Sequence, residues 1–299
     1  MKEILITTTC FLLLLKFVPA QNTKLASTPP MGWMSWNFFF FYINEKDLKE
    51  MAGAMVSSGM AKAGYNYIFI DDGWQGGRDN KNNMLADPVK FPSGIKALAK
   101  YMHDRGLKLG IYSDAAQLTC AGYTASLGFE EQDAKTFAGW DIDYLKYDYC
   151  HAPVDVETAK LRYKKMADAL RNSGREIVFG ICEWGPRKPW LWAAAVGGQL
   201  WRTTYDIRDK WKNLSANENA EGILDILDIN AALHEYAGIG KWNDADMLVT
   251  GLYGKKGPSG DLGGTGCTDT EYQTQFSLWA IMNAPLYATN DLRNMNEAT

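Results

Sequence analysis

The sequence has 299 residues, of which 35 are acidic and 31 basic, so its formal charge is −4; 46% of the residues are hydrophobic and 13% aromatic. This is the composition of an ordinary globular protein, and it excludes disordered, collagen-like and disulfide-dense classes. Nucleic acid is excluded as a partner too, because the chain has neither a net excess nor a clustered stripe of Lys and Arg.

The chain begins with a pattern typical of a signal peptide. Met1 and Lys2 precede the apolar run Ile4–Leu15, and a Val18-Pro19-Ala20 site follows. The run is shorter than the roughly 20 apolar residues that span a bilayer. The sequence therefore predicts cleavage after Ala20, export to the periplasm or the exterior, and no membrane attachment of the mature protein. Removing 20 residues from 299 leaves 279, which suits one α/β barrel of about 250 residues.

Apolar runs of strand length then alternate with segments of helical periodicity. Strands are expected over Met31–Trp36, Tyr65–Asp71, Leu107–Asp114, Tyr144–Asp148, Ile177–Glu183, Leu200–Asp206, Lys241–Met247 and Pro285–Asn290. Helices are expected over Lys46–Ala63, Ile95–Met102, Glu130–Ala138, Ala159–Leu170, Glu218–Tyr236 and Asp269–Met282. Alternating β and α elements with eight strands predict an α/β protein with a closed (β/α)8 TIM barrel over residues 21–299.

Too little chain follows the eighth strand for an eighth helix, since only Asp291–Thr299 remain. The sequence therefore predicts a barrel that is C-terminally incomplete, truncated before its last helix.

Nearly every apolar strand run ends in an acid. These acids are Asp71, Asp72, Asp114, Asp148, Glu183, Asp206, Asp244 and Asp246. A single such acid is more often a helix cap than a functional group. Six strand ends in succession instead favour an active site on the C-terminal rim, where barrel enzymes place their chemistry.

Two strands offer the residues of a hydrolytic site. The period of two puts Lys146 and Asp148 on one face, where Lys146 would keep Asp148 ionised as a nucleophile; a structural ion pair is the alternative. The same period of two places Arg202 and Asp206 on one face of another strand, two strands after the one that carries Lys146 and Asp148. Two inward carboxylates on separate strands are what glycoside hydrolysis requires.

Cofactor and cysteine chemistry are less well defined. The three histidines, His103, His151 and His234, lie far apart in the sequence with no HxH or HExxH arrangement, which argues against a histidine-rich metal site. Cys120, Cys150, Cys182 and Cys267 would follow the signal peptide into an oxidising compartment, and their spacing leaves the pairing open.

Seven motifs in order carry a resemblance to the α-galactosidases of glycoside hydrolase family 27, from about Thr28 to Thr299. They are Pro29–Asn37, Ile70–Trp74, Gly110–Asp114, Leu145–Asp148, Cys182–Gly185, Trp201–Ile207 and Trp242–Met247. The resemblance implies a retaining exo-glycosidase that needs no cofactor and releases terminal α-galactose, with Asp148 as nucleophile and Asp206 as acid/base. It leaves homodimerisation open.

The same resemblance implies the remaining site residues. Sugar contacts fall on Trp36, Asp71, Asp72, Tyr112, Cys120, Lys146, Glu183, Arg202 and Asp246, whereas Trp33 is expected to fill the core. It also implies a Cys120–Cys150 disulfide, with Cys182 and Cys267 free. Here the sequence departs from relatives with further bridges, because Phe38–Tyr42 contains no cysteine and Gly73 stands where some have one. Family members usually continue into a β-sandwich domain after the barrel, and residues 1–299 are not expected to include it.

Alternatives remain open. The protein could be a related α-N-acetylgalactosaminidase or β-L-arabinopyranosidase, an aldolase-like barrel with Lys146 as a Schiff-base lysine, or a galactose-binding protein without catalysis. Glu183 and the intact Asp71-Asp72 pair favour α-galactose. A conflict also stays open, because Arg202 would lower the pKa of Asp206 whereas a general acid needs a raised pKa.

Overall fold

The computed structural model describes residues 25–213, 220–255, 257–258 and 264–299. Eight parallel strands form one sheet in the order β11-β8-β7-β6-β5-β2-β1-β12. Their bounds are β1 Met31–Met34, β2 Tyr67–Phe69, β5 Lys108–Asp114, β6 Tyr144–Asp148, β7 Val178–Ile181, β8 Leu200–Arg202, β11 Trp242–Asp244 and β12 Leu286–Ala288. Each of the eight predicted strands contributes one of them.

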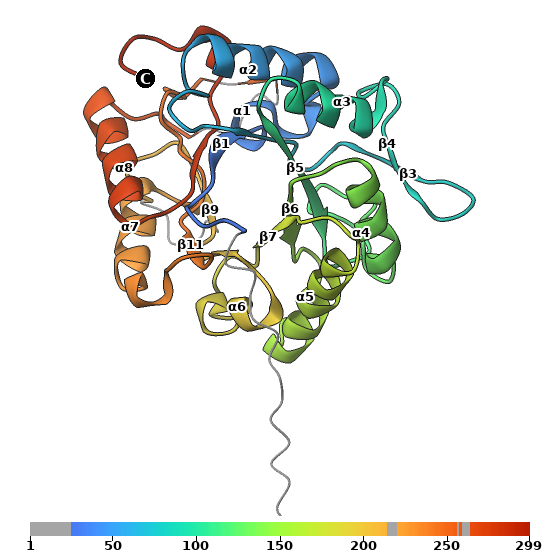
Figure 1. Ribbon diagram of the computed structural model, residues 1–299. Helices are drawn as coiled ribbons and strands as arrows, with labels where there is room; N and C mark the ends of the chain where they lie inside the picture. The colour runs from blue at the N-terminus through green and yellow to red at the C-terminus, as the bar shows by residue number, and fades with distance from the viewer. Residues whose placement is uncertain (1–24, 214–219, 256, 259–263) are drawn as a thin grey trace, which may run out of the picture.

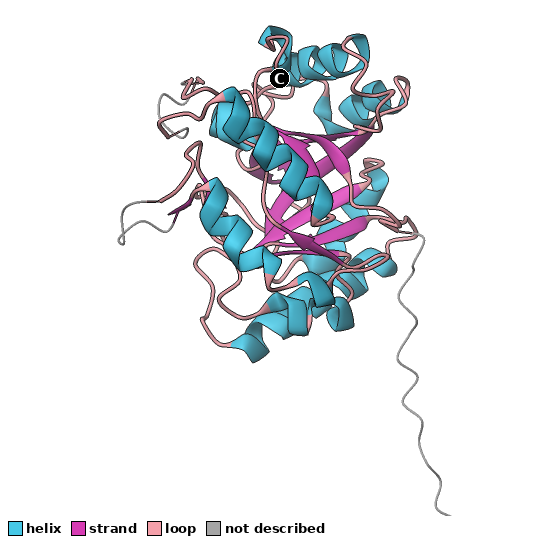
Figure 2. Cartoon of the chain, turned by 90° about the vertical axis from the view of Figure 1, so that its left-hand side faces the viewer, coloured by secondary structure: helices cyan, strands magenta, loops and turns pink. Residues whose placement is uncertain are grey.

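The sheet closes into a barrel. The last strand, β12, pairs with the first, β1, and a parallel bridge between Leu248 and Ala288 joins the segment after β11 to β12. The strands ring a common centre and the helices lie outside them (Figure 1). The side view shows the same two layers (Figure 2). The predicted (β/α)8 architecture is therefore confirmed.

The helices are α1 Trp36–Phe39, α2 Glu45–Ser57, α3 Gly94–His103, α4 Glu130–Gly139, α5 Val156–Arg171, α6 Ala193–Val196, α7 Ile223–Ala231 and α8 Asp269–Ile281. Short 3₁₀ helices are η1 Phe40–Tyr42, η2 Pro189–Leu191, η3 His234–Tyr236 and η4 Leu292–Asn294. The last of these, η4, packs against α2, where Arg293 pairs with Asp47 and Glu50.

Side-chain caps explain where several helices begin. Asn44 accepts a hydrogen bond from the backbone N–H of Asp47 at the start of α2, and Asp155 does the same for Thr158 at the start of α5. Thr268 and Glu271 form a reciprocal capping box that starts α8.

Two predicted helices are too long. The first ends at Ser57 instead of Ala63, because Gly59 takes a positive φ of 90° just beyond it. The second, predicted over Glu218–Tyr236, is helical only as α7 and then turns into η3. Residues 218 and 219 lie outside the described part of the chain, as does the predicted signal peptide.

One predicted strand is also split. The run Leu200–Asp206 leaves the sheet after Arg202, whose guanidinium donates to the carbonyl of Thr204 and holds the turn. Asp206 instead lies on β9, Asp206–Ile207, which pairs with β10, Ala220–Glu221. That pair is parallel. The sequence pattern also did not show the antiparallel pair of β3, Gln75–Arg78, with β4, Met84–Ala86.

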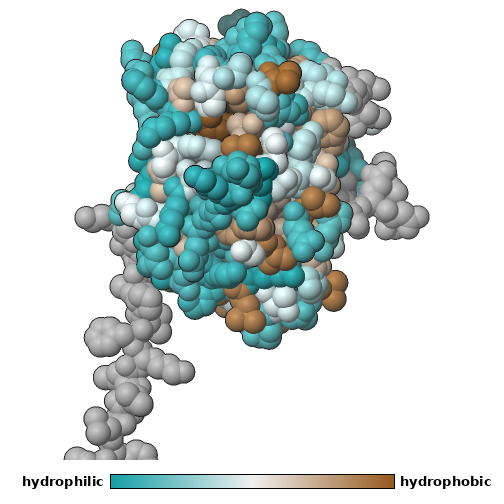
Figure 3. Space-filling model, turned by 90° about the vertical axis from the view of Figure 1, so that its right-hand side faces the viewer, coloured by the Kyte–Doolittle hydropathy of each residue, from teal (hydrophilic) through white to brown (hydrophobic). Residues whose placement is uncertain are grey.

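The side chains inside the barrel are mainly aromatic. Phe69 contacts the rings of Tyr144 and Tyr287, each with centroids 4.8 Å apart, and all three are buried. Trp33 is also fully buried and donates its indole N–H to the carbonyl of Asn290, as the predicted core position requires. By contrast, the outer face in Figure 3 is mostly hydrophilic, with hydrophobic residues scattered singly or in small groups. Among the described residues, no helix is long and apolar enough to cross a membrane.

Gly110 on β5 makes room for this aromatic interior, because a Cβ atom there would overlap the Phe69 ring. We expect Gly110→Ala to lower the free energy of unfolding by about 1–3 kcal/mol through overpacking. Urea denaturation would measure it. Gly139→Ala is the matched control, since nothing lies within 4 Å of the Cβ it would add at the end of α4. Equal stability of the two variants would contradict this account of the core.

Candidate active site

All eleven predicted site residues lie within the described part of the chain, and strands or the segments that follow them carry them to one rim of the barrel. Parallel strands bring their carboxyl ends to the same edge. The register places Lys146 beside Tyr112 and Asp148 beside Asp114 on neighbouring strands β6 and β5. The acid-rich strand ends therefore converge, as the sequence predicted.

Lys146 forms its ion pair with Asp71 rather than with Asp148. The ammonium Nζ lies 2.8 Å from an Asp71 carboxylate oxygen, and both side chains are largely buried. Burial raises the pKa of Asp148 to about 6, although the Lys146 charge opposes this rise. Lys146 therefore acts on the Asp148 pKa in the predicted direction, but desolvation outweighs this cation, whose direct partner is another carboxylate.

Asp148 is held by hydrogen bonds on both oxygens. The Tyr112 hydroxyl donates to one carboxylate oxygen at 2.9 Å, and the backbone N–H of Tyr149 donates to the other at 2.9 Å. Only 5% of the surface of Asp148 is exposed. Its position is therefore fixed at the end of β6, with few rotamers available.

The acid pair after β2 connects to the loop that carries Cys120. Asp72 accepts a hydrogen bond from the backbone N–H of Ala121 at 2.9 Å, and burial raises the pKa of Asp72 to about 6. Cys120 forms a disulfide with Cys150, two residues after Asp148. This bridge confirms the pairing that the family resemblance implied. Cys182 and Cys267 are both free.

Arg202 joins the other carboxylates. Its guanidinium lies 2.9 Å from Asp246 and 3.1 Å from Asp206, and its side chain is buried. Burial alone would raise the pKa of Asp206, but Arg202, Lys146 and Arg208 together hold that pKa below its ordinary value. In the free protein, the effect of these cations on the Asp206 pKa is therefore larger than the effect of burial.

Glu183 has a partner that sequence reasoning missed. Its carboxylate is fully buried after β7 and lies 3.0 Å from the guanidinium of Arg187. Arg187 also stacks over the Tyr149 ring at 4.6 Å and donates to the carbonyl of Val154. Burial raises the pKa of Glu183 to about 7 against the opposing effect of Arg187. The i, i+4 spacing of Glu183 and Arg187 was the feature of the sequence that could have indicated this ion pair.

Trp36 lies at the edge of this rim and is half-buried on α1. The preceding residue, Ser35, accepts a hydrogen bond from the backbone N–H of Asp71, which fixes the end of β1 against the acid pair. The arrangement can bind a hydroxyl-rich ligand, because carboxylates accept and cations donate directional hydrogen bonds around one opening. Two carboxylates with different environments, Asp148 and Asp206, can also divide acid and nucleophile roles.

Comparisons with known proteins agree with this geometry. A family profile described as "Alpha galactosidase A" matches residues 28–299. The chain is 50% identical over 279 residues to an α-galactosidase A of Cellvibrio japonicus and 48% identical over 281 residues to α-galactosidase 2 of Arabidopsis thaliana. These alignments cover 92% and 93% of this chain, which spans 65% of the length of each relative. The crystal structure of α-galactosidase I from Mortierella vinacea is similar with a TM-score of 0.84 and 37% identity, covering 93% of this chain and 70% of that one.

Proposed function

The chain belongs to the α-galactosidases of glycoside hydrolase family 27, and on that premise we propose that it is an exo-acting retaining glycosidase for terminal, non-reducing α-D-galactose. Its substrates would be galacto-oligosaccharides or glycoconjugates. The observation that carries the proposal is the pair Asp148 and Asp206, which lie close enough for the Asp206 charge to raise the Asp148 pKa.

In the proposed mechanism Asp148 attacks the anomeric carbon while Asp206 protonates the departing glycosidic oxygen. The bond from carbon to the Asp148 oxygen forms as the glycosidic bond breaks. Asp206 then takes a proton from water, which displaces Asp148 and restores both residues. Two inversions give net retention. The side chain of Asp206 is 37% exposed, so a bound leaving group would desolvate it and raise its pKa toward that of an acid.

The galactose ring would lie among the remaining site residues. Asp71 and Asp72 would accept hydrogen bonds from its 4- and 6-hydroxyls, Glu183 would face the 2-hydroxyl, and Trp36 would cover the apolar side of the ring. Lys146 holds Asp71 in place, and Tyr112 holds Asp148. Arg202 holds Asp206 and Asp246. Cys120 would line the site through its bridged loop.

Parallel hydrolysis of chromogenic α-galactoside, α-N-acetylgalactosaminide and β-L-arabinopyranoside tests the proposal. We expect the α-galactoside to be strongly preferred, with early-time NMR showing release of α-galactose. Preference for either other substrate would overturn the specificity, and an inverted product would overturn the mechanism. Export through the N-terminal leader and assembly as a homodimer remain predictions.

Arg187→Met provides a test of the Glu183 role. Without the Arg187 charge the pKa of Glu183 should rise above its present value of about 7, so the group would be mostly neutral at pH 7. A neutral carboxyl accepts sugar hydroxyls less well, and we expect KM at pH 7 to rise about tenfold. The acid limb of kcat/KM should move to higher pH, because more alkaline solution is needed to ionise the group.

Arg187→Lys is the matched control, since it keeps the charge and should restore part of the loss. A pH profile identical to that of the unchanged protein would show that Arg187 acts only on folding.

A further inference from the structure

Arg208 is a half-buried arginine whose guanidinium group has a nitrogen without a partner. Its Nη1 atom is buried, and no group in the described part of the chain accepts a hydrogen bond from it. Burying a guanidinium nitrogen without an acceptor costs free energy, and arginine is the side chain best suited to bind planar or paired oxygen acceptors. A buried donor of this kind marks a place where a ligand can supply the missing acceptor.

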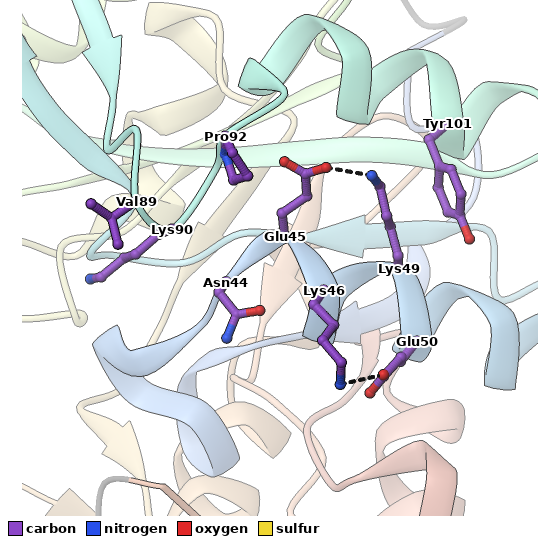
Figure 4. A pocket seen from close by; sticks show the side chains of 9 residues that line it. All are labelled: Asn44, Glu45, Lys46, Lys49, Glu50, Val89, Lys90, Pro92 and Tyr101. Atoms are coloured by element: carbon purple, nitrogen blue, oxygen red, sulfur yellow. Dashed lines mark hydrogen bonds and ion pairs between the residues drawn. The ribbon is translucent and has the colours of Figure 1, made fainter.

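Other cations of the protein have their acceptors within the chain. Figure 4 shows a pocket at the start of α2 in which Lys46 pairs with Glu50 and Lys49 pairs with Glu45. Both ammonium groups are thus balanced by a carboxylate one helical turn away. Among the described residues, no such acceptor contacts the Nη1 atom of Arg208.

The strand geometry puts Arg208 beside the proposed acid/base residue. Asp206 and Ile207 form β9, and the backbone N–H of Arg208 continues the pairing with β10 by donating to the carbonyl of Glu221 at 2.9 Å. Ile207 and Asp209 are fully buried, whereas Asp206 and Arg208 are half-buried. This alternation places Asp206 and Arg208 on one side of the chain. The Arg208 charge also helps to lower the pKa of Asp206, as a nearby cation does.

Two arginines therefore flank Asp206. Arg202 belongs to the barrel strand β8 and also pairs with Asp246, so it lies toward the strand ends that carry the proposed galactose site. Arg208 instead follows β9, which is not part of the eight-stranded sheet. In the proposed mechanism Asp206 protonates the glycosidic oxygen, so the leaving group must lie against Asp206 and away from the galactose.

We propose that Arg208 binds the leaving-group sugar, by donating hydrogen bonds from its guanidinium to the hydroxyl oxygens of that sugar. This inference rests on the proposed function and adds a specificity-determining residue to it. A guanidinium presents five N–H donors in a fixed plane, a geometry that suits neighbouring hydroxyls on a sugar ring. These hydroxyls would supply the acceptor that Nη1 lacks, and they would hold the glycosidic oxygen next to Asp206.

The test compares an α-galactosyl disaccharide with methyl α-galactoside. Both leaving groups are alkoxides that need a proton from Asp206, so a change in the Asp206 pKa affects both substrates alike. Only the disaccharide has hydroxyls on its leaving group. In Arg208→Met, the ratio of kcat/KM for the disaccharide to kcat/KM for methyl α-galactoside should fall about tenfold, because a hydrogen bond to a charged group is lost. Arg208→Lys keeps the charge but not the planar group, and it should lower the ratio less.

Arg171→Met is the matched control, since Arg171 ends α5 and pairs with Asp168, and it should leave the ratio unchanged. An unchanged ratio in Arg208→Met, with kcat/KM altered equally on both substrates or on neither, would overturn the inference and leave the proposed function intact. If Arg208→Met fails to fold, the same ratio in Arg208→Lys decides. If the unchanged protein hydrolyses neither substrate, the proposed function fails, and this inference fails with it.

Discussion

Replacing Asp148 with asparagine should abolish turnover and yet make the folded protein more stable at neutral pH. The amide has nearly the same shape as the carboxylate but is a far weaker nucleophile, so we expect kcat to fall by on the order of a thousandfold or more. The fold should persist, because the Tyr149 N–H can still donate to the amide oxygen and the Tyr112 hydroxyl can accept from the amide nitrogen.

The stability gain follows from the raised pKa of Asp148, about 6 in the folded protein against an ordinary value of 3.8. Between those two values the folded state binds more protons than the unfolded state, so stability falls as pH rises. Above about pH 6 the whole penalty is present, on the order of 2–3 kcal/mol. The asparagine side chain carries no charge and escapes this penalty.

Thermal melts of both proteins at pH 7 and pH 4 would measure the effect. We expect the variant to melt higher at pH 7 and the difference to shrink toward pH 4, where the carboxyl is increasingly protonated in both states. Near wild-type turnover would refute the nucleophile role. A variant that is inactive and also less stable at pH 7 would refute the burial of the Asp148 charge.

Much of the fold follows from patterns that are local in the sequence. Apolar runs of strand length located all eight barrel strands, and their terminal acids predicted the functional rim. Local patterns were not sufficient where the structure depends on contacts between distant residues. Lys146 pairs with Asp71, which is 75 residues away, and no local pattern ranks that partner above Asp148. The strand predicted to reach Asp206 stops at Arg202, because a buried guanidinium binds the turn that follows.

The sequence also could not predict how far each side chain is buried or how burial shifts its pKa. The sequence shows that Arg202 and Asp206 lie near each other, but the pKa of Asp206 depends on how desolvation compares with three cations from separate segments. Likewise, five aromatic residues in succession, Phe38–Tyr42, indicate packing without saying which rings are buried. Only the structure separates Phe39, in the core, from Phe40 beside Trp36.

Asp206→Asn should harm hydrolysis in proportion to how much the leaving group needs a proton. A sugar alkoxide is a poor leaving group, so the loss on a natural α-galactosyl oligosaccharide should be about 10²- to 10⁴-fold. A dinitrophenolate departs without protonation, so the first chemical step on dinitrophenyl α-galactoside should slow far less. The second step still lacks its base on either substrate, because Asp206 must also activate water.

Rapid-mixing kinetics would separate these steps. With the dinitrophenyl substrate, the variant should release a burst of dinitrophenolate equal to the enzyme concentration and then turn over slowly, as the galactosyl group accumulates on Asp148. Asp209→Asn is a matched control, since Asp209 is a buried carboxylate three residues from Asp206 whose side chain accepts hydrogen bonds from Tyr272 and Gly254. Equal slowing of the first step on both substrates, without a burst, would exclude Asp206 as the acid. The low pKa of Asp206 in the free protein would then describe a carboxylate whose task is to hold Arg202 in place.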